Sequence, residues 1–105
     1  MRTPTAEPIA HPKLDEIELP AVLHALSDPV RLRIVAGLAR RDDLSCGSFE
    51  LGVTKSTCTH HFRVLREAGI IRQRHAGTAR LNTLRREELD ARFPGLLGTI
   101  LDAAG

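Results

Sequence analysis

Residues 55–84 read KSTCTHHFRVLREAGIIRQRHAGTARLNTL, and this stretch decides the fold. Its first part predicts a helix over about 55–68, because Thr54 can cap the free amides at the start and Gly69 suits the end. The remainder predicts a hairpin of two short strands, 70–75 and 78–84, around Ala76-Gly77. We therefore expect a helix that is followed directly by a β-hairpin.

The residues before this stretch predict further helices. Pro20 fits the first turn of a helix over about 20–27, and Asp28-Pro29 suits the start of a helix over about 29–40. Ser45 can cap a short helix over about 46–51, with a turn before Thr54. A short helix, a tight turn and a longer helix form a helix-turn-helix, and a hairpin after it forms a wing. The expected fold is thus mostly α with a small β-hairpin wing, a winged helix-turn-helix in a single domain.

The rest of the chain fits this arrangement. Residues 85–93 predict a short helix that Pro94 stops, and a small apolar segment follows over 96–101. Proline is frequent and apolar residues are few over 1–13, so we expect a flexible N-terminal arm there, in which His11 is disordered. The folded domain is expected to cover 14–105.

Composition excludes several classes of protein. The chain has 105 residues, of which 42% are apolar and 27% are charged, a balance typical of one globular domain. It has three Phe and no Trp or Tyr, which argues against the stacking platforms of single-strand binders. No apolar run approaches the ~18 residues of a membrane span, and the N-terminal residues lack a signal-peptide pattern. Two cysteines are too few for a disulfide framework, so we expect a cytoplasmic protein that inserts in no membrane.

Positive charge is clustered rather than spread. Residues 55–86 contain eight Lys and Arg side chains against Glu67 alone, whereas the segments on both sides are net acidic. Clustered cations attract polyanions and release their counterions on contact. The alternative interpretation is a solvated surface that is rich in arginine.

The helix expected over 55–68 divides into two faces. Cys58, Phe62 and Leu65 share the face that should pack on the core, with His61 at its margin. The opposite stripe is polar and consists of Lys55, Ser56, Thr59, His60 and Arg63. A recognition helix needs this division, because one face is anchored while the other reaches base edges and phosphates in the major groove. An ordinary amphipathic surface helix is the alternative, but the absence of acidic residues from 51 to 66 favours DNA.

The expected hairpin extends the basic surface. Its polar side chains that can follow the DNA backbone or enter the minor groove are Arg72, Arg74, His75, Thr78 and Arg80. We therefore predict a contact surface for double-stranded DNA that combines the helix stripe with the wing.

These residues resemble the ArsR/SmtB family of winged-helix transcriptional repressors. The resemblance rests on LHALSDPVRLRIVAGLA (23–39), on the stretch 55–84, and on the short helix between them. It implies a homodimer joined through its N-terminal and C-terminal helices, with Leu23 and Leu97 in the interface. It also implies that Ser56, Thr59, His60 and Arg63 face operator DNA, and that an inducer releases the repressor.

The chain departs from the family pattern in three places. Residues 44–54 are about two residues shorter than the common helix-turn-helix segment. The arsenic-sensing pair of cysteines around one residue is missing, since only Cys46 stands there. The C-terminal helix lacks the Asp/His and His/Glu pairs of the interfacial zinc site. The resemblance therefore implies no particular inducer or cofactor.

Cys46 and Cys58 occupy positions where the pattern expects apolar residues, which favours a packing role. The alternative is a thiol sensor, in which a bond between the sulfurs, or a thiophilic metal or metalloid bridging them, distorts the recognition helix. His61 lies three residues after Cys58 and can complete a set of ligands. Thiol catalysis by Cys58 with His60 or His61 lacks an orienting third group, so we expect no enzyme. A winged helix that binds an acidic protein partner is the remaining alternative.

Overall fold

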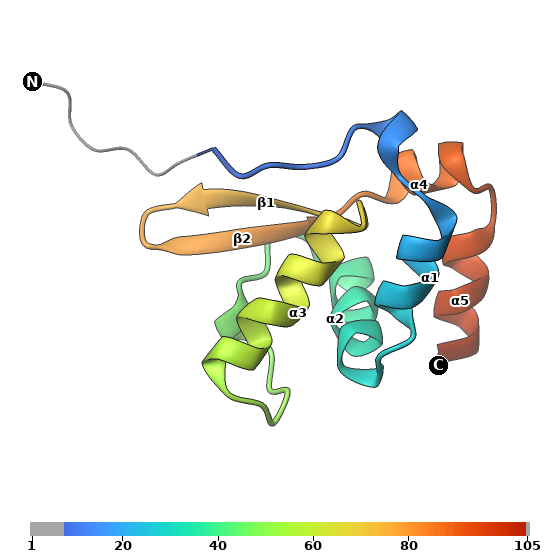
Figure 1. Cartoon of the computed structure of the whole chain (residues 1–105). Coiled ribbons are helices and arrows are strands. Elements are labelled where there is room, and N and C mark those ends of the chain that lie inside the picture. The colour runs from blue at the N-terminus through green and yellow to red at the C-terminus, as the bar shows by residue number, and fades with distance from the viewer. Residues whose placement is uncertain (1–7, 105) are drawn as a thin grey trace, which may run out of the picture.

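The computed structural model describes residues 8–104, which form five α-helices, two short 3₁₀ helices and one β-hairpin (Figure 1). The elements follow the order η1 (Leu14–Glu16), α1 (Leu19–Leu26), α2 (Pro29–Arg40), η2 (Cys46–Ser48), α3 (Lys55–Glu67), β1 (Ile71–Ala76), β2 (Ala79–Leu84), α4 (Arg86–Arg92) and α5 (Leu96–Ala104). The predicted winged helix-turn-helix is confirmed.

The hairpin projects from one end of the helical body, and α1 and α5 lie at the other end (Figure 1). Its strands are antiparallel, with Ile71 opposite Leu84 and Ala76 opposite Ala79. The C-terminal end of α3 lies beside the base of the hairpin, and the helix slants away from the strands toward its N-terminal end (Figure 1). The helix and the wing therefore lie next to each other in the fold.

Side chains next to the helix ends determine where α2 and α3 begin. The Asp28 carboxylate accepts the amides of Val30 (2.8 Å) and Arg31 (3.1 Å) at the start of α2. Burial alone would raise the pKa of Asp28, but these amides and the charge of Arg31 hold it below its usual value. The Thr54 hydroxyl accepts the Thr57 amide (3.2 Å) at the start of α3. Both predicted caps are confirmed.

Gly69 ends α3 as predicted and also permits close packing. Its φ is +86°, in the left-handed region that favours glycine. A Cβ at this position would lie 2.6 Å from the Ile17 side chain, which is 1% exposed. Glycine thus both turns the chain and admits Ile17 into the core.

The core is aliphatic, as the composition requires. Every α-helix and both strands supply buried side chains to it. The largest that are almost completely buried are Ile17, Ile34, Leu38, Leu65, Ile70 and Ile71. Within residues 8–104, no helix has the length and apolar character needed to cross a membrane.

Two expected elements have different lengths in the structure. The predicted helix over 46–51 is only the three-residue turn Cys46–Ser48, and the Ser45 hydroxyl bonds to the Ser48 hydroxyl (3.2 Å) instead of capping an amide. Gly47 lies within this segment and disfavours a longer helix. The apolar segment expected over 96–101 belongs to the longer helix α5.

His11 is not disordered, contrary to expectation. Its Nε2 accepts the Gln73 amide (2.9 Å), and the neighbouring carbonyl of Pro12 accepts from Arg85 (2.8 Å). Burial, together with the charges of Arg72, Arg85 and Arg66, lowers the pKa of His11. Residues 8–13 therefore lie along β1 (Figure 1), while residues 1–7 of the expected arm lie outside the described part of the chain.

Candidate nucleic-acid interface

Helix α3 has the two faces that the sequence predicts. Its buried side chains are Cys58, His61, Phe62 and Leu65. All residues of the predicted polar stripe are exposed, namely Lys55, Ser56, Thr59, His60 and Arg63. The helix therefore presents hydrogen-bonding groups to solvent along its outer side.

Within this stripe, side chains are partly ordered by their own helix. The Thr59 hydroxyl donates to the Lys55 carbonyl (3.0 Å), and the Arg63 guanidinium donates to Nδ1 of His60 (3.2 Å). Lys55 forms no ion pair with any residue of the described chain. The stripe thus combines a fixed arginine with a lysine whose charge is not neutralised nearby.

A buried arginine holds α3 against the preceding helices. Arg31 is 7% exposed, and its Nε donates to the Ala25 carbonyl (2.7 Å). The same guanidinium lies 3.2 Å from Nδ1 of His61 on α3. Because a guanidinium only donates, this ring nitrogen must accept. Sequence reasoning missed this contact, since its partners lie 30 residues apart and no local pattern marks it.

A second polar network joins α3 to the wing. Arg66 on α3 donates to the side-chain oxygen of Gln73 (3.0 Å), which in turn donates to Asn82 (2.8 Å). Asn82 donates to the Leu44 carbonyl (2.9 Å) and forms a bridge with that residue. Gln73 and Asn82 face each other across the hairpin and are both buried. In the sequence, only their alternation with the exposed residues of the two strands indicates that Gln73 and Asn82 lie on the inner face of the hairpin.

Several arginines of the basic cluster, on β1 and at the start of α4, are engaged within the protein. Arg72 pairs with Glu88 (2.8 Å), and Arg74 pairs with Asp43 (3.1 Å). Arg85 is buried against Glu88, and Arg86 donates to the Ala39 carbonyl (2.8 Å). Part of the positive charge counted over residues 55–86 therefore serves contacts within the protein and is not free for a partner.

Glu88 neutralises two of these arginines at once. Hydrogen bonds from Arg85, opposed by burial of the carboxylate and reinforced by Arg72, lower the pKa of Glu88 to about 2. The Arg85 side chain is 1% exposed, whereas that of Arg72 is 53% exposed. Arg85 thus belongs to the interior, and Arg72 lies at the surface with a partner.

The outer end of the hairpin remains polar and open. His75 lies opposite Arg80 in the strand register, and Thr78 lies in the turn. All three are exposed, and Arg80 forms no ion pair among residues 8–104. The wing residues most accessible to a partner are therefore those near the tip.

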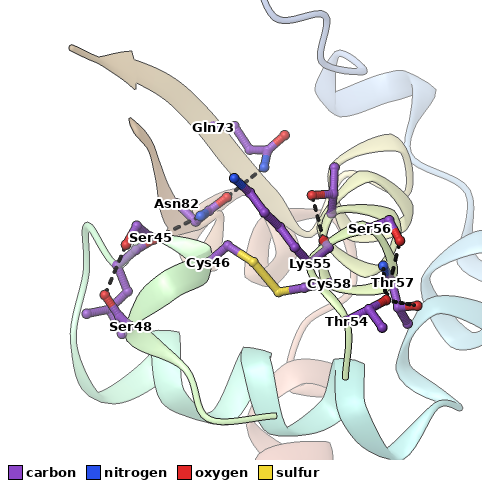
Figure 2. The surroundings of a disulfide bond; sticks show 12 residues. Ser45, Cys46, Ser48, Thr54, Lys55, Ser56, Thr57, Cys58, Gln73 and Asn82 are labelled. Atoms are coloured by element: carbon purple, nitrogen blue, oxygen red, sulfur yellow. Dashed lines mark hydrogen bonds between the residues drawn. A yellow bond between two sulfur atoms is a disulfide. The ribbon is translucent and has the colours of Figure 1, made fainter. Parts of the chain in front are cut away.

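The two cysteines are joined in a disulfide between η2 and α3 (Figure 2). Their Cα atoms are 6.7 Å apart, within the range that a disulfide can bridge. Helix α3 nevertheless runs unbroken from Lys55 to Glu67, so the expected distortion is absent. In this structure Nδ1 of His61 is bonded to Arg31, and the described residues contain no group of three His, Cys, Asp or Glu side chains that could hold a metal ion.

Apolar side chains remain exposed at the end opposite the wing. They are Leu14 (40%), Leu19 (40%) and Leu23 (46%), in η1 and α1. Leu97, which was expected at a dimer interface, is only 4% exposed and packs within the chain's own core. A charged residue at Leu97 would therefore disrupt the fold itself, so this substitution does not isolate dimerisation.

Comparison with known proteins places the chain among transcriptional regulators. The family model described as a helix-turn-helix domain matches residues 26–74. The uncharacterised HTH-type transcriptional regulator YceK of Bacillus subtilis strain 168 is 34% identical over 82 residues, which are 75% of this chain and 82% of YceK.

Two solved structures also share the fold. The transcriptional repressor BigR from Xylella fastidiosa is 27% identical with a TM-score of 0.61, and the match covers 81% of this chain and 84% of that one. An ArsR-like transcriptional regulator from Rhodococcus sp. RHA1 is 28% identical with a TM-score of 0.61, over 81% of this chain and 83% of that one. These relatives are regulators, not enzymes.

Proposed function

Since this chain belongs to the ArsR-like helix-turn-helix transcriptional regulators, we propose that it represses transcription as a homodimer on a two-fold symmetric DNA site until an inducer releases it. The observation that carries this proposal is the exposed polar stripe of α3. It contains no acidic residue, and it lies on a helix that the core and Arg31 hold in place.

In this proposal α3 enters the major groove. Ser56 and Thr59 are short and allow close approach, while Arg63 can reach a guanine edge or a phosphate. Lys55, at the helix start, contacts a phosphate. His60, which accepts from Arg63, orients that guanidinium.

The hairpin contacts the flanking backbone or minor groove through its tip, with His75, Thr78 and Arg80. Arg72 and Arg74 contribute positive charge near the DNA while they retain Glu88 and Asp43 as partners. We therefore assign them a weaker role than Arg80.

The exposed leucines of η1 and α1 support dimerisation at the end away from the wing. An apolar surface of this kind is stabilised when a second copy covers it. A two-fold dimer would present two copies of α3 to half-sites about one helical turn apart.

Selection of bound duplexes from a random pool tests the proposal. We expect enrichment of a two-fold symmetric sequence, with affinity that falls steeply as salt rises. Arg63→Ala and Thr59→Ala should each weaken binding by about 1–3 kcal/mol if the side chain contacts a base. Arg33→Ala, an exposed position on α2, removes the same charge outside the stripe and should bind normally.

Binding that survives both stripe substitutions at physiological salt would contradict the assigned face. Failure to enrich any duplex, together with capture of an acidic protein in a salt-dependent manner, would instead favour the protein-binding alternative.

A further inference from the structure

We propose that Cys46 and Cys58 form a reversible thiol–disulfide site that controls DNA affinity, with the oxidised form binding more tightly. This inference rests on the proposed function and adds its regulation. The two sulfurs join η2 to the first part of α3 and enclose the segment between them (Figure 2).

The enclosed segment carries the start of the recognition helix. It includes Thr54, which caps α3, and also Lys55 and Ser56 of the polar stripe. The disulfide therefore acts directly on groups that are proposed to meet DNA, whereas most of the protein lies outside the loop.

Few other bonds hold this segment in place. Within the described chain, residues 50–53 make no backbone hydrogen bond. The η2 turn has only three residues, and Phe49 contacts Phe62 with ring centroids 5.9 Å apart. Reduction would therefore leave residues 50–53 held mainly by the packing of Leu51 in the core, and binding DNA would then require ordering them.

The bond is accessible to small molecules. Both cysteines line a surface groove of about 280 Å³, whose other lining residues are Gly47, Phe49, Leu51, Val53 and Lys55. Lys55 lines the same groove, and its ammonium extends away from the two sulfurs (Figure 2). The groove gives a small reagent access for thiol exchange.

A DNA-binding regulator works where low-molecular-weight thiols keep most cysteines reduced, so a disulfide there is usually transient. The co-reactant that we propose is a low-molecular-weight disulfide. The Cys46 thiolate, the more exposed of the two, attacks one of its sulfurs and releases one thiolate. Cys58 then attacks the Cys46 sulfur and releases the second, so two electrons and two protons leave the protein for the reagent.

The recognition helix α3 is intact when the disulfide is present, and this predicts which redox form binds DNA more tightly. Helix α3 is continuous and its stripe is exposed in the disulfide form. Oxidation thus pre-organises the binding surface, and reduction loosens it. We expect the reduced full-length protein to bind the selected duplex about tenfold more weakly.

The test compares full-length protein reduced with dithiothreitol and re-oxidised with oxidised glutathione. Thiol titration reports the bond, fluorescence anisotropy of the labelled selected duplex reports binding, and circular dichroism reports the fold. Cys46→Ser removes the bond and leaves the buried Cys58 in place, so it should bind like the reduced form under both conditions. Ser48→Ala, an exposed neighbour, should keep the redox response.

Equal affinity of the reduced and oxidised forms, or tighter binding by the reduced form, would overturn the inference and leave the proposed function standing. Two free thiols after incubation with oxidised glutathione would also overturn it. If neither form binds any duplex, the proposed function fails as well.

Discussion

The Glu88→Gln substitution tests the ion pairs that connect Glu88 on α4 with Arg72 on β1 and with Arg85. The Glu88 carboxylate accepts two hydrogen bonds from Arg85, at 2.9 Å and 2.6 Å, and one from Arg72 at 2.8 Å. The amide of glutamine keeps the shape and removes the charge. Arg85, whose side chain is 1% exposed, then loses its only ionised partner among the described residues.

The pKa of Glu88 sets the size of the effect. It falls from 4.5 to about 2, which corresponds to roughly 3 kcal/mol at 1.36 kcal/mol per unit. The carboxylate is 31% exposed and the paired Arg72 is 53% exposed, so solvent screening reduces this value. We expect a loss of about 2 kcal/mol in the free energy of unfolding at neutral pH, or roughly 10 °C in Tm.

The effect should depend on pH in one direction. Because the folded state lowers the pKa of Glu88, the ionised carboxylate stabilises the protein fully above pH 4.5, and this stabilisation is lost as pH falls toward 2. Urea unfolding of the unsubstituted protein and of the Glu88→Gln variant between pH 7 and pH 3 should therefore show a difference in the free energy of unfolding that becomes smaller as the pH falls.

Glu87→Gln is the matched control, since Glu87 precedes Glu88 on α4 and is exposed. It removes the same charge and should change stability by less than about 0.5 kcal/mol. Equal losses of stability in the two variants, or a Glu88→Gln deficit that is the same at every pH, would contradict this role of the Glu88 charge.

Three further predictions concern other parts of the molecule. Gly69→Ala should cost about 2–4 kcal/mol in urea unfolding, because a Cβ would lie 2.6 Å from Ile17 at a positive φ; Gly77→Ala has open space and should cost much less. Leu23→Glu should convert dimers into folded monomers by light scattering, and an unchanged mass would contradict the proposed interface. Lowering the pH below 6.5 should weaken the attachment of residues 8–13 to β1, because the folded state holds the pKa of His11 below 6.5 and the protonated ring cannot accept a hydrogen bond. Hydrogen exchange of the Gln73 amide checks this, and constant protection at acid pH would oppose it.

The anchoring of α3 has a consequence for recognition. Arg31 and Arg66 tie its buried side to α1 and to the wing through bonded polar groups, not only through apolar packing. Such groups have directional requirements, so they restrict rotation of the helix more than aliphatic contacts do. A fixed rotation keeps the same stripe turned toward a groove.

The sequence by itself determined the order of elements, the caps at Asp28 and Thr54, the glycine at the end of α3, and the division of α3 into two faces. These features depend on residues within about one helical turn of each other, so periodicity and local hydrogen bonding predict them. The predicted length of the helix over 46–51 was wrong, because the three-residue turn Cys46–Ser48 has almost no periodic pattern in the sequence.

Only the tertiary structure decided which polar groups meet. His11 and Gln73 are 62 residues apart, Arg31 and His61 are 30 apart, and the two cysteines are 12 apart. The same is true of the ion pairs that occupy Arg72 and Arg74, whose charges a sequence count treats as free. Distances between such residues depend on how the helices and the hairpin pack together, and a charge or a thiol has no local pattern that names its partner.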